Sequence, residues 1–181
     1  MAGFARISRC VLALLLGAPL LGGCGLHPVY ARAPNGEAGP AAKGLAEISV
    51  GLIPERTGQL LRLALQERLE RNGLASAHRY DLAVTFAISN AVIGVQQDTS
   101  NVRFRLVGTA NYQLIAQDPG RTTLTTGMAR SVDGLNLFDQ QLFAADLETE
   151  VVEQRLAEAV ADEIAQQLAI YFDHQAALAA R

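Results

Sequence analysis

The stretch Tyr-Asp-Leu-Ala-Val-Thr-Phe-Ala-Ile, residues 80–88, alternates between large apolar side chains and small or polar ones. A period of two residues predicts a β-strand with one buried face. The alternation can be followed as far as Val95, so we expect the strand to end there at the latest. This strand sets the fold because the chain on either side of it must cover its apolar face.

Two further strands follow this one in the sequence. Residues 102–116 alternate in the same way after a polar turn at 96–101, and a Thr-rich strand at 122–132 follows the turn signal Asp-Pro-Gly at 118–120. Three consecutive strands joined by short turns predict an antiparallel meander. On the last strand we expect a buried face made by Leu124, Met128 and Val132 and an open face that carries Thr123 and Thr125.

Helical spacing appears upstream and downstream of the meander. Residues 55–72 place leucines on one side of an amphipathic helix, and a long helix is predicted for 140–172 after a loop at 133–139. A short apolar stretch at 45–53 suits a further strand. The long helix has a stripe spaced by four residues, which consists of Leu156, Val160, Ile164 and Leu168.

The element order is therefore β-α-β-β-β-α, which is typical of an α+β fold. We expect two helices packed on one face of a four-stranded, mostly antiparallel sheet, within a single α/β sandwich domain at 45–175 followed by a C-terminal tail at 176–181. The second face of the sheet is left for solvent or a partner. The third strand places Arg103 and Arg105 on it.

The N-terminal segment has a basic lead with Arg6 and Arg9, then an apolar run at 11–21 that is too short to span a bilayer. It ends in Leu-Gly-Gly-Cys, which looks like the lipobox of a bacterial lipoprotein. This pattern predicts removal of a signal peptide at 1–23 and N-acyl and S-diacylglycerol modification of Cys24. Residues 24–44 hold three of the six prolines and many Gly and Ala residues, so we expect a lipidated flexible tether.

Composition excludes several functional classes. Loss of Arg6 and Arg9 with the signal peptide would change the formal charge from −3 to −5, which argues against a nucleic-acid partner. The sequence has no Gly-x-Ser-x-Gly or His-Glu-x-x-His motif, and its three histidines are scattered. We therefore expect no enzyme activity and no cofactor other than the covalent lipid on Cys24.

Three motifs resemble one known family. Cys-Gly-Leu-His-Pro-Val-Tyr at 24–30, Arg-Thr-Gly-Gln at 56–59 and Leu-Ala-Ile-Tyr-Phe at 168–172 are similar to motifs of the lipopolysaccharide-assembly lipoprotein family LptE, in its alphaproteobacterial form. Leu26 departs from the usual Phe, and residues 131–141 lack the Ser- and Tyr-rich run expected before the last helix.

The resemblance implies a plug and assembly subunit inside the outer-membrane barrel that inserts lipopolysaccharide, a protein of LptD type. It implies an outer-membrane location on the periplasmic face, and Gly25 after the lipid cysteine is consistent with it. Contact with lipopolysaccharide or the barrel would use arginine, a good phosphate partner. For any single candidate, an ordinary solvent-facing strand arginine, which discourages edge-to-edge pairing, is the more common explanation. The candidates are Arg103, Arg105, Arg121 and Arg130.

A second function remains open at this level. Accessory lipoproteins of periplasmic ABC-type lipid-transport systems also combine a lipobox with a small α/β domain. The two functions differ in the partner that each requires, a barrel or an inner-membrane transporter.

Overall fold

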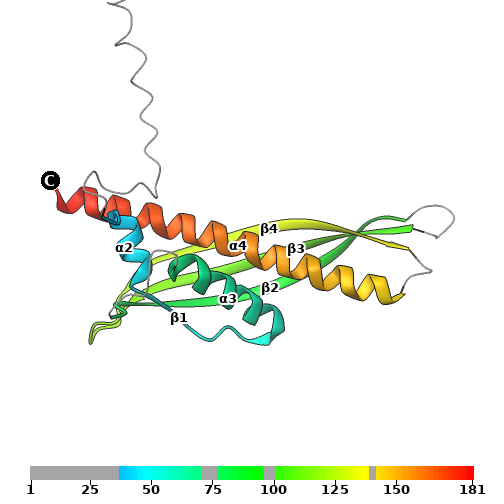
Figure 1. Cartoon of the computed structure of the whole chain (residues 1–181), viewed down its shortest axis with the longest axis horizontal. Coiled ribbons are helices and arrows are strands. Elements are labelled where there is room, and N and C mark those ends of the chain that lie inside the picture. The colour runs from blue at the N-terminus through cyan, green and yellow to red at the C-terminus, as the bar shows by residue number, and fades with distance from the viewer. Residues whose placement is uncertain (1–36, 71–76, 96–100, 139–141) are drawn as a thin grey trace, which may run out of the picture.

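The computed structural model describes residues 37–70, 77–95, 101–138 and 142–181. Two layers are visible in Figure 1, a long twisted sheet and the helices that lie along one of its faces. The predicted α+β class and the predicted order of strands and long helices are confirmed. The elements are α2 (Pro40–Ala46), β1 (Ile48–Val50), α3 (Glu55–Leu69), β2 (Tyr80–Val95), β3 (Asn101–Ala116), β4 (Thr123–Phe138) and α4 (Leu142–Ala179).

The strands lie in the order β1-β2-β3-β4. The short strand β1 pairs with β2 in parallel, Ile48 opposite Tyr80, and the other neighbours are antiparallel. β4 continues to Phe138, so the loop predicted at 133–139 is wrong over most of its length. Its Asp and Gly residues are turn-like by composition, but β3 offers backbone partners along the whole stretch and this pairing decides the conformation.

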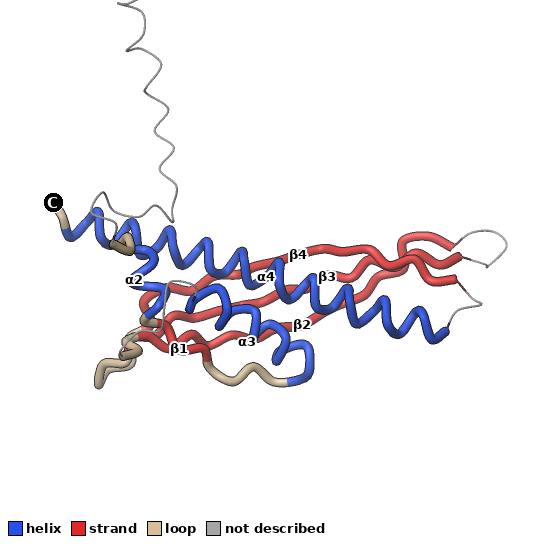
Figure 2. Tube along the Cα trace, in the orientation of Figure 1, coloured by secondary structure: helices blue, strands red, loops and turns tan. Residues whose placement is uncertain are grey.

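Both long helices cover the same face of the sheet (Figure 2). The 38 residues of α4 correspond to about 57 Å. The 16-residue strands β2, β3 and β4 correspond to about 53 Å each, so the helix and the sheet match in length. The helix also continues to Ala179, through most of the segment predicted as a C-terminal tail, because its last turns are rich in alanine, a strong helix former.

The helix α2 falls partly within the predicted tether. Pro40 occupies its first turn, where a missing backbone N–H costs little. Ala41 and Leu45 are fully buried, and a Cβ on Gly44 would lie 2.5 Å from the Phe172 ring of α4. The small residues that suggested a flexible chain instead let α2 approach α4 closely, a contact that local composition does not reveal.

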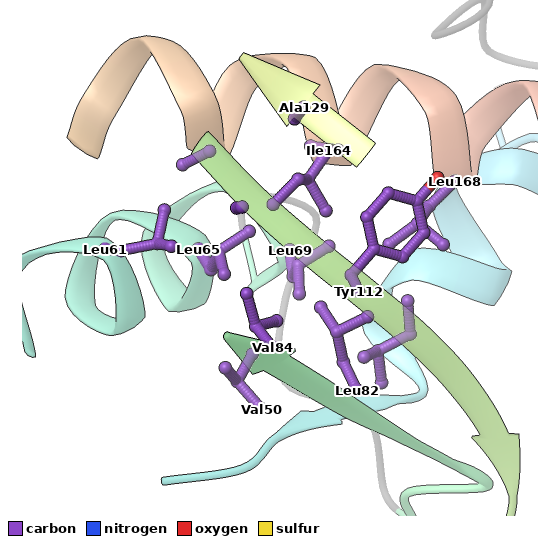
Figure 3. Close-up of a cluster of buried hydrophobic side chains, with 14 of the residues drawn as sticks. Val50, Leu61, Leu65, Leu69, Leu82, Val84, Tyr112, Ala129, Ile164 and Leu168 are labelled. Atoms are coloured by element: carbon purple, nitrogen blue, oxygen red, sulfur yellow. The ribbon is translucent and has the colours of Figure 1, made fainter. Parts of the chain in front are cut away.

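The core lies between the sheet and the helices (Figure 3). Leu82 and Val84 of β2 meet Leu65 of α3 and Ile164 and Leu168 of α4 there. The predicted stripe of α4 is confirmed, since all four of its members are buried. Within the described ranges, none of the helices combines the length and the hydropathy that a membrane span requires.

The strand β4 contains a bulge near its start. Leu114 of β3 lies opposite Thr125, and the next residue, Ile115, lies opposite Thr123. Leu124 is therefore an additional residue on β4, and its side chain packs against the core as predicted. The extra residue reverses which side chains of the following strand face the helices.

This reversal corrects two sequence-based predictions for β4. Met128 and Val132, predicted to be buried, are 56% and 52% exposed, whereas Ala129 between them is fully buried. Thr125 lies opposite the buried Leu114 and faces the helix layer, although Thr123 is exposed as expected. The open face of the sheet is therefore less polar than the sequence suggests.

Candidate functional site

The face of the sheet that the helices leave open is the candidate site. Side chains alternate along a strand, so laterally paired residues of β2, β3 and β4 form rows across this face. Each row has one residue from each of the three strands. In order from the end of the sheet near the β3–β4 turn, the rows are Asp81–Ile115–Thr123, Ala83–Gln113–Thr126, Thr85–Asn111–Met128, Ala87–Thr109–Arg130, Ser89–Val107–Val132 and Ala91–Arg105–Gly134.

The structure brings Arg105 and Arg130 together on this face. Both are exposed, and the row that contains Val107 and Val132 lies between theirs. Neither guanidinium has an ion-pair partner among the residues that the structure describes, so both remain available to an external anion. The arrangement is a pair of cations separated by aliphatic side chains.

A neutral hollow of about 690 Å³ occupies the same face nearer the β3–β4 turn. Asn111 and Gln113 of β3 form its floor, and Leu52 of the loop between β1 and α3 borders it. Leu52 is 77% exposed, an unusual position for a large apolar side chain. Amide, hydroxyl, methyl and thioether groups line the hollow, so it suits an uncharged group with both polar and apolar parts. The other lining residues are Gly51, Ala83, Val84, Thr85, Tyr112, Thr126, Gly127 and Met128.

A hydrogen-bond network from α4 supports the strands beneath this face. The Tyr112 hydroxyl donates to Gln167 Oε1 at 2.7 Å, and Gln167 Nε2 donates to the Met128 carbonyl at 3.1 Å. Glu163 Oε2 accepts from the Arg130 backbone N–H at 3.0 Å. Burial raises the pKa of Tyr112, and the negative charge of Glu163 raises it further. These hydrogen bonds hold the β4 backbone in place at Met128 and Arg130.

The remaining predicted site residues lie elsewhere. Arg121 is in the turn before β4, in a left-handed conformation with φ of 45°, and its guanidinium pairs with Asp81 at 2.9 Å. It is therefore at the far end of the sheet from Arg105. The backbone of Arg103 belongs to β3, but its side chain lies outside the described part of the structure, and Cys24 precedes the described residues altogether.

Sequence reasoning missed the apolar part of the site. It assigned Met128 and Val132 to the core because large side chains in an alternating strand normally mark the buried face. The true buried position, Ala129, is small because it packs opposite Ala110 of β3, and both are fully buried. The bulge can be recognised only from the strand pairing, so no local signal would have placed Met128 and Val132 on the open face.

The part of the chain that the structure describes contains no cluster of His, Cys, Asp and Glu side chains that could hold a metal ion. A search of the curated proteins finds no match. In contrast, the family model described as "LptE: Lipopolysaccharide-assembly" matches residues 45–168, about two thirds of the chain.

Solved structures share the fold. A lipoprotein of Caulobacter crescentus superposes with a TM-score of 0.60 at 20% identity, covering 74% of this chain and 96% of its own. A minor lipoprotein of Acinetobacter baumannii gives 0.56 at 13% identity, with coverages of 68% and 90%. Rare lipoprotein B of Shewanella oneidensis gives 0.53 at 13% identity, with coverages of 71% and 97%.

Proposed function

The chain belongs to the LptE lipopolysaccharide-assembly family, and from this premise we propose that it is a non-enzymatic, lipid-anchored subunit of the outer-membrane lipopolysaccharide translocon. In this role it plugs a barrel of LptD type and assists lipopolysaccharide assembly at the cell surface. Its anchor is the lipid on Cys24, and its domain lies on the periplasmic side of the outer membrane. The family match favours this role over that of an accessory lipoprotein in an ABC-type lipid-transport system.

The observation that carries the proposal is the chemistry of the open sheet face. Lipopolysaccharide presents phosphate groups beside acyl chains, so a complementary surface needs cations next to apolar groups. Arg105 and Arg130 supply guanidinium groups that have no ion-pair partner among the described residues, and such groups bind phosphate through paired N–H donors. Val107, Val132 and Met128 supply the neighbouring aliphatic and thioether surface.

The polar remainder of the face supports placement within a barrel. The interior of an outer-membrane barrel is polar. Thr85, Asn111 and Gln113 place hydroxyl and amide groups on the surface that would meet such a wall. Such groups can form hydrogen bonds to the wall directly or through water.

Binding of lipopolysaccharide to the purified domain tests the contact. The double variant Arg105→Ala, Arg130→Ala is expected to bind purified lipopolysaccharide about tenfold more weakly, because two charge-assisted hydrogen bonds to phosphate are lost at an exposed surface. The matched control is Arg79→Ala, Arg181→Ala, which removes the same charge from exposed positions outside the face. Equal affinity of the two double variants would show that these arginines are ordinary surface residues.

Co-purification tests the partner. A tagged full-length chain extracted from its native membrane is expected to bring down the lipopolysaccharide-inserting barrel. Recovery of an inner-membrane transporter in its place would assign the chain to the alternative transport system. Depletion should lower both the level of folded barrel and the amount of surface lipopolysaccharide.

A further inference from the structure

The two edges of the sheet differ in the way that they are closed. At the β4 edge, side chains of α4 form hydrogen bonds with backbone groups of the strand. Gln167 donates to the Met128 carbonyl, and Glu163 accepts from the Arg130 N–H. At the other edge, β1 pairs with β2 only from Tyr80 to Leu82. The β4 edge is thus protected by hydrogen bonds at Met128 and Arg130, whereas no strand among the described residues pairs with the β2 edge beyond Leu82.

The direction of the backbone groups on β2 follows from one hydrogen bond. The Leu82 carbonyl accepts from the Gly51 N–H, so it points away from β3. Backbone groups of alternate residues point the same way along an antiparallel strand, and the pairing with β3 is regular as far as Val92. The N–H and C=O groups of Phe86, Ile88 and Asn90 therefore point outward, and no strand among the described residues pairs with them.

The middle of this edge carries none of the features that usually prevent strand pairing, and the β-bulge between Val92 and Gly94 lies beyond it. Between Ala83 and Val95 the sequence has no charged residue and no proline, although exposed edges are normally blocked by one or the other. The strand is also 16 residues long, whereas blunted edges are short. This edge is therefore built to accept a strand rather than to repel one.

The side chains beside the edge define the chemistry of its occupant. Phe86 and Ile88 are only partly buried on the helix side. On the open face, Ala87 and Ser89 are small and exposed. A fifth strand would place one set of alternate side chains against Phe86 and Ile88 and the other set beside Ala87 and Ser89.

From this geometry we propose that the outer edge of β2, residues Phe86–Asn90, binds an extended segment of another polypeptide whose residues alternate between apolar and polar. The segment adds to the sheet as a fifth strand. Main-chain hydrogen bonds hold it, and its apolar residues complete the cover over Phe86 and Ile88. The inference does not depend on the proposed role in lipopolysaccharide assembly, because it concerns the edge and not the open face.

A single segment fits this edge better than a second copy of the chain. The loop after β1 stands beside the edge where Leu52 borders the hollow with Ala83 and Thr85. A second copy paired through its own β2 would bring an identical loop and an identical α3 to the same edge. A lone extended segment has no such neighbours to accommodate.

Amide hydrogen exchange on the full chain in detergent tests the proposal. The probe is a capped peptide of alternating valine and threonine with a lysine at each end, and the control peptide has proline at its central valine. The amides of Phe86, Ile88 and Asn90 are expected to exchange at least tenfold more slowly with the probe and to be unchanged with the control. The amides of Ala87 and Ser89, which point toward β3, are the internal reference and should be slow throughout.

Three outcomes would overturn the proposal. Slow exchange of the three edge amides without peptide, at every protein concentration, would mean that the chain covers its own edge. Slowing that depends on protein concentration alone would identify a second copy as the occupant. Failure of the probe to slow these amides would remove the edge as a docking site.

A substitution on the protein provides the matched evidence. Asn90→Pro removes one outward N–H and leaves the pairing with β3 intact, so the probe should bind about fivefold more weakly. Asn90→Ala keeps the N–H and is expected to bind like the original chain. Circular dichroism checks that both variants are folded, and equal weakening by both would assign the effect to the Asn90 side chain instead.

Discussion

Gly127 shows how closely two residues fit within this sheet. A Cβ built on it would lie 2.4 Å from Tyr112 Oη, and the Tyr112 side chain is buried, with its hydroxyl donating to Gln167 Oε1. We expect Gly127→Ala to lower the free energy of unfolding by about 1–3 kcal/mol, because the ring or β4 must move. Urea denaturation measures the change.

The control for this substitution is on the same strand. A Cβ on Gly134 would have its nearest neighbour, the Phe104 carbonyl oxygen, at 3.9 Å. Gly134→Ala should therefore be neutral or slightly stabilising, since alanine in a strand costs less conformational entropy than glycine. Similar losses in the free energy of unfolding for the two variants would show that the tight contact at Gly127 is not the cause of the destabilisation.

Tyr112 makes stability depend on pH at the alkaline end. Burial, together with Glu163, raises the pKa of its phenol above the ordinary value of about 10, so the fold favours the neutral form. This contribution is fully present below about pH 10 and is lost as pH rises through the raised pKa of the folded state. We expect Tyr112→Phe to cost about 1 kcal/mol at pH 7 and progressively less above pH 10. Denaturation at a series of pH values checks this, and a difference that stays constant with pH would contradict it.

At the scale of elements, Gln167 of α4 joins the helix to both β3 and β4. Gln167 accepts from Tyr112 and donates to the Met128 carbonyl, so Gln167→Ala leaves two partners without a bond. We expect a loss of about 1–2 kcal/mol in the free energy of unfolding and faster amide exchange along the outer edge of β4. The adjacent Gln166 is exposed and provides the matched control, and Gln166→Ala should change neither quantity.

The acidic side of α4 also makes contacts that the sequence alone does not show. The run of acidic residues in the sequence is typical of a solvated helix face, but several of the carboxylates form ion pairs with neighbouring elements. Asp162 pairs with Arg68 of α3, and Glu150 pairs with Arg56. The pairing with Asp162 raises the pKa of Arg68, with burial acting in the opposite direction. Helical periodicity shows which residues face outward, but it does not show that another helix or a strand edge lies within reach of them.

At the scale of the whole molecule, the predicted anchor can be separated from the fold. Cys24 lies outside the described residues, and the domain core is built from residues 41–172. We expect Cys24→Ala to leave thermal unfolding of the domain unchanged and to shift the chain from the membrane fraction to the soluble fraction. The fractionation is done in cells that lack the proposed barrel partner, because such a partner would itself retain the chain in the membrane fraction.

Most of the architecture could be predicted because it rests on two strong periodic signals. Alternation over residues 80–88 gave β2, and the spacing of Leu156, Val160, Ile164 and Leu168 gave α4. The helix α2 and the bulge at Leu124 could not be predicted, because each depends on a partner distant in sequence. The same limit applies to the site. The position of Arg105 on the open face could be predicted from the alternation of the strand, but its proximity to Arg130 and the exposure of Met128 depend on the strand register.

The matched lengths of α4 and the sheet have a consequence at a membrane. The hydrocarbon layer of a bilayer is about 30 Å thick, and the domain is about 55 Å long. A domain of this length, aligned with the axis of a membrane barrel, would therefore extend roughly 25 Å beyond that layer. The row with Arg105 lies six to eight residues of strand, or about 20–26 Å, from the hollow. Arg105 and the hollow would then lie at different depths, with Arg130 between them, because its row adjoins the row of Met128 at the border of the hollow.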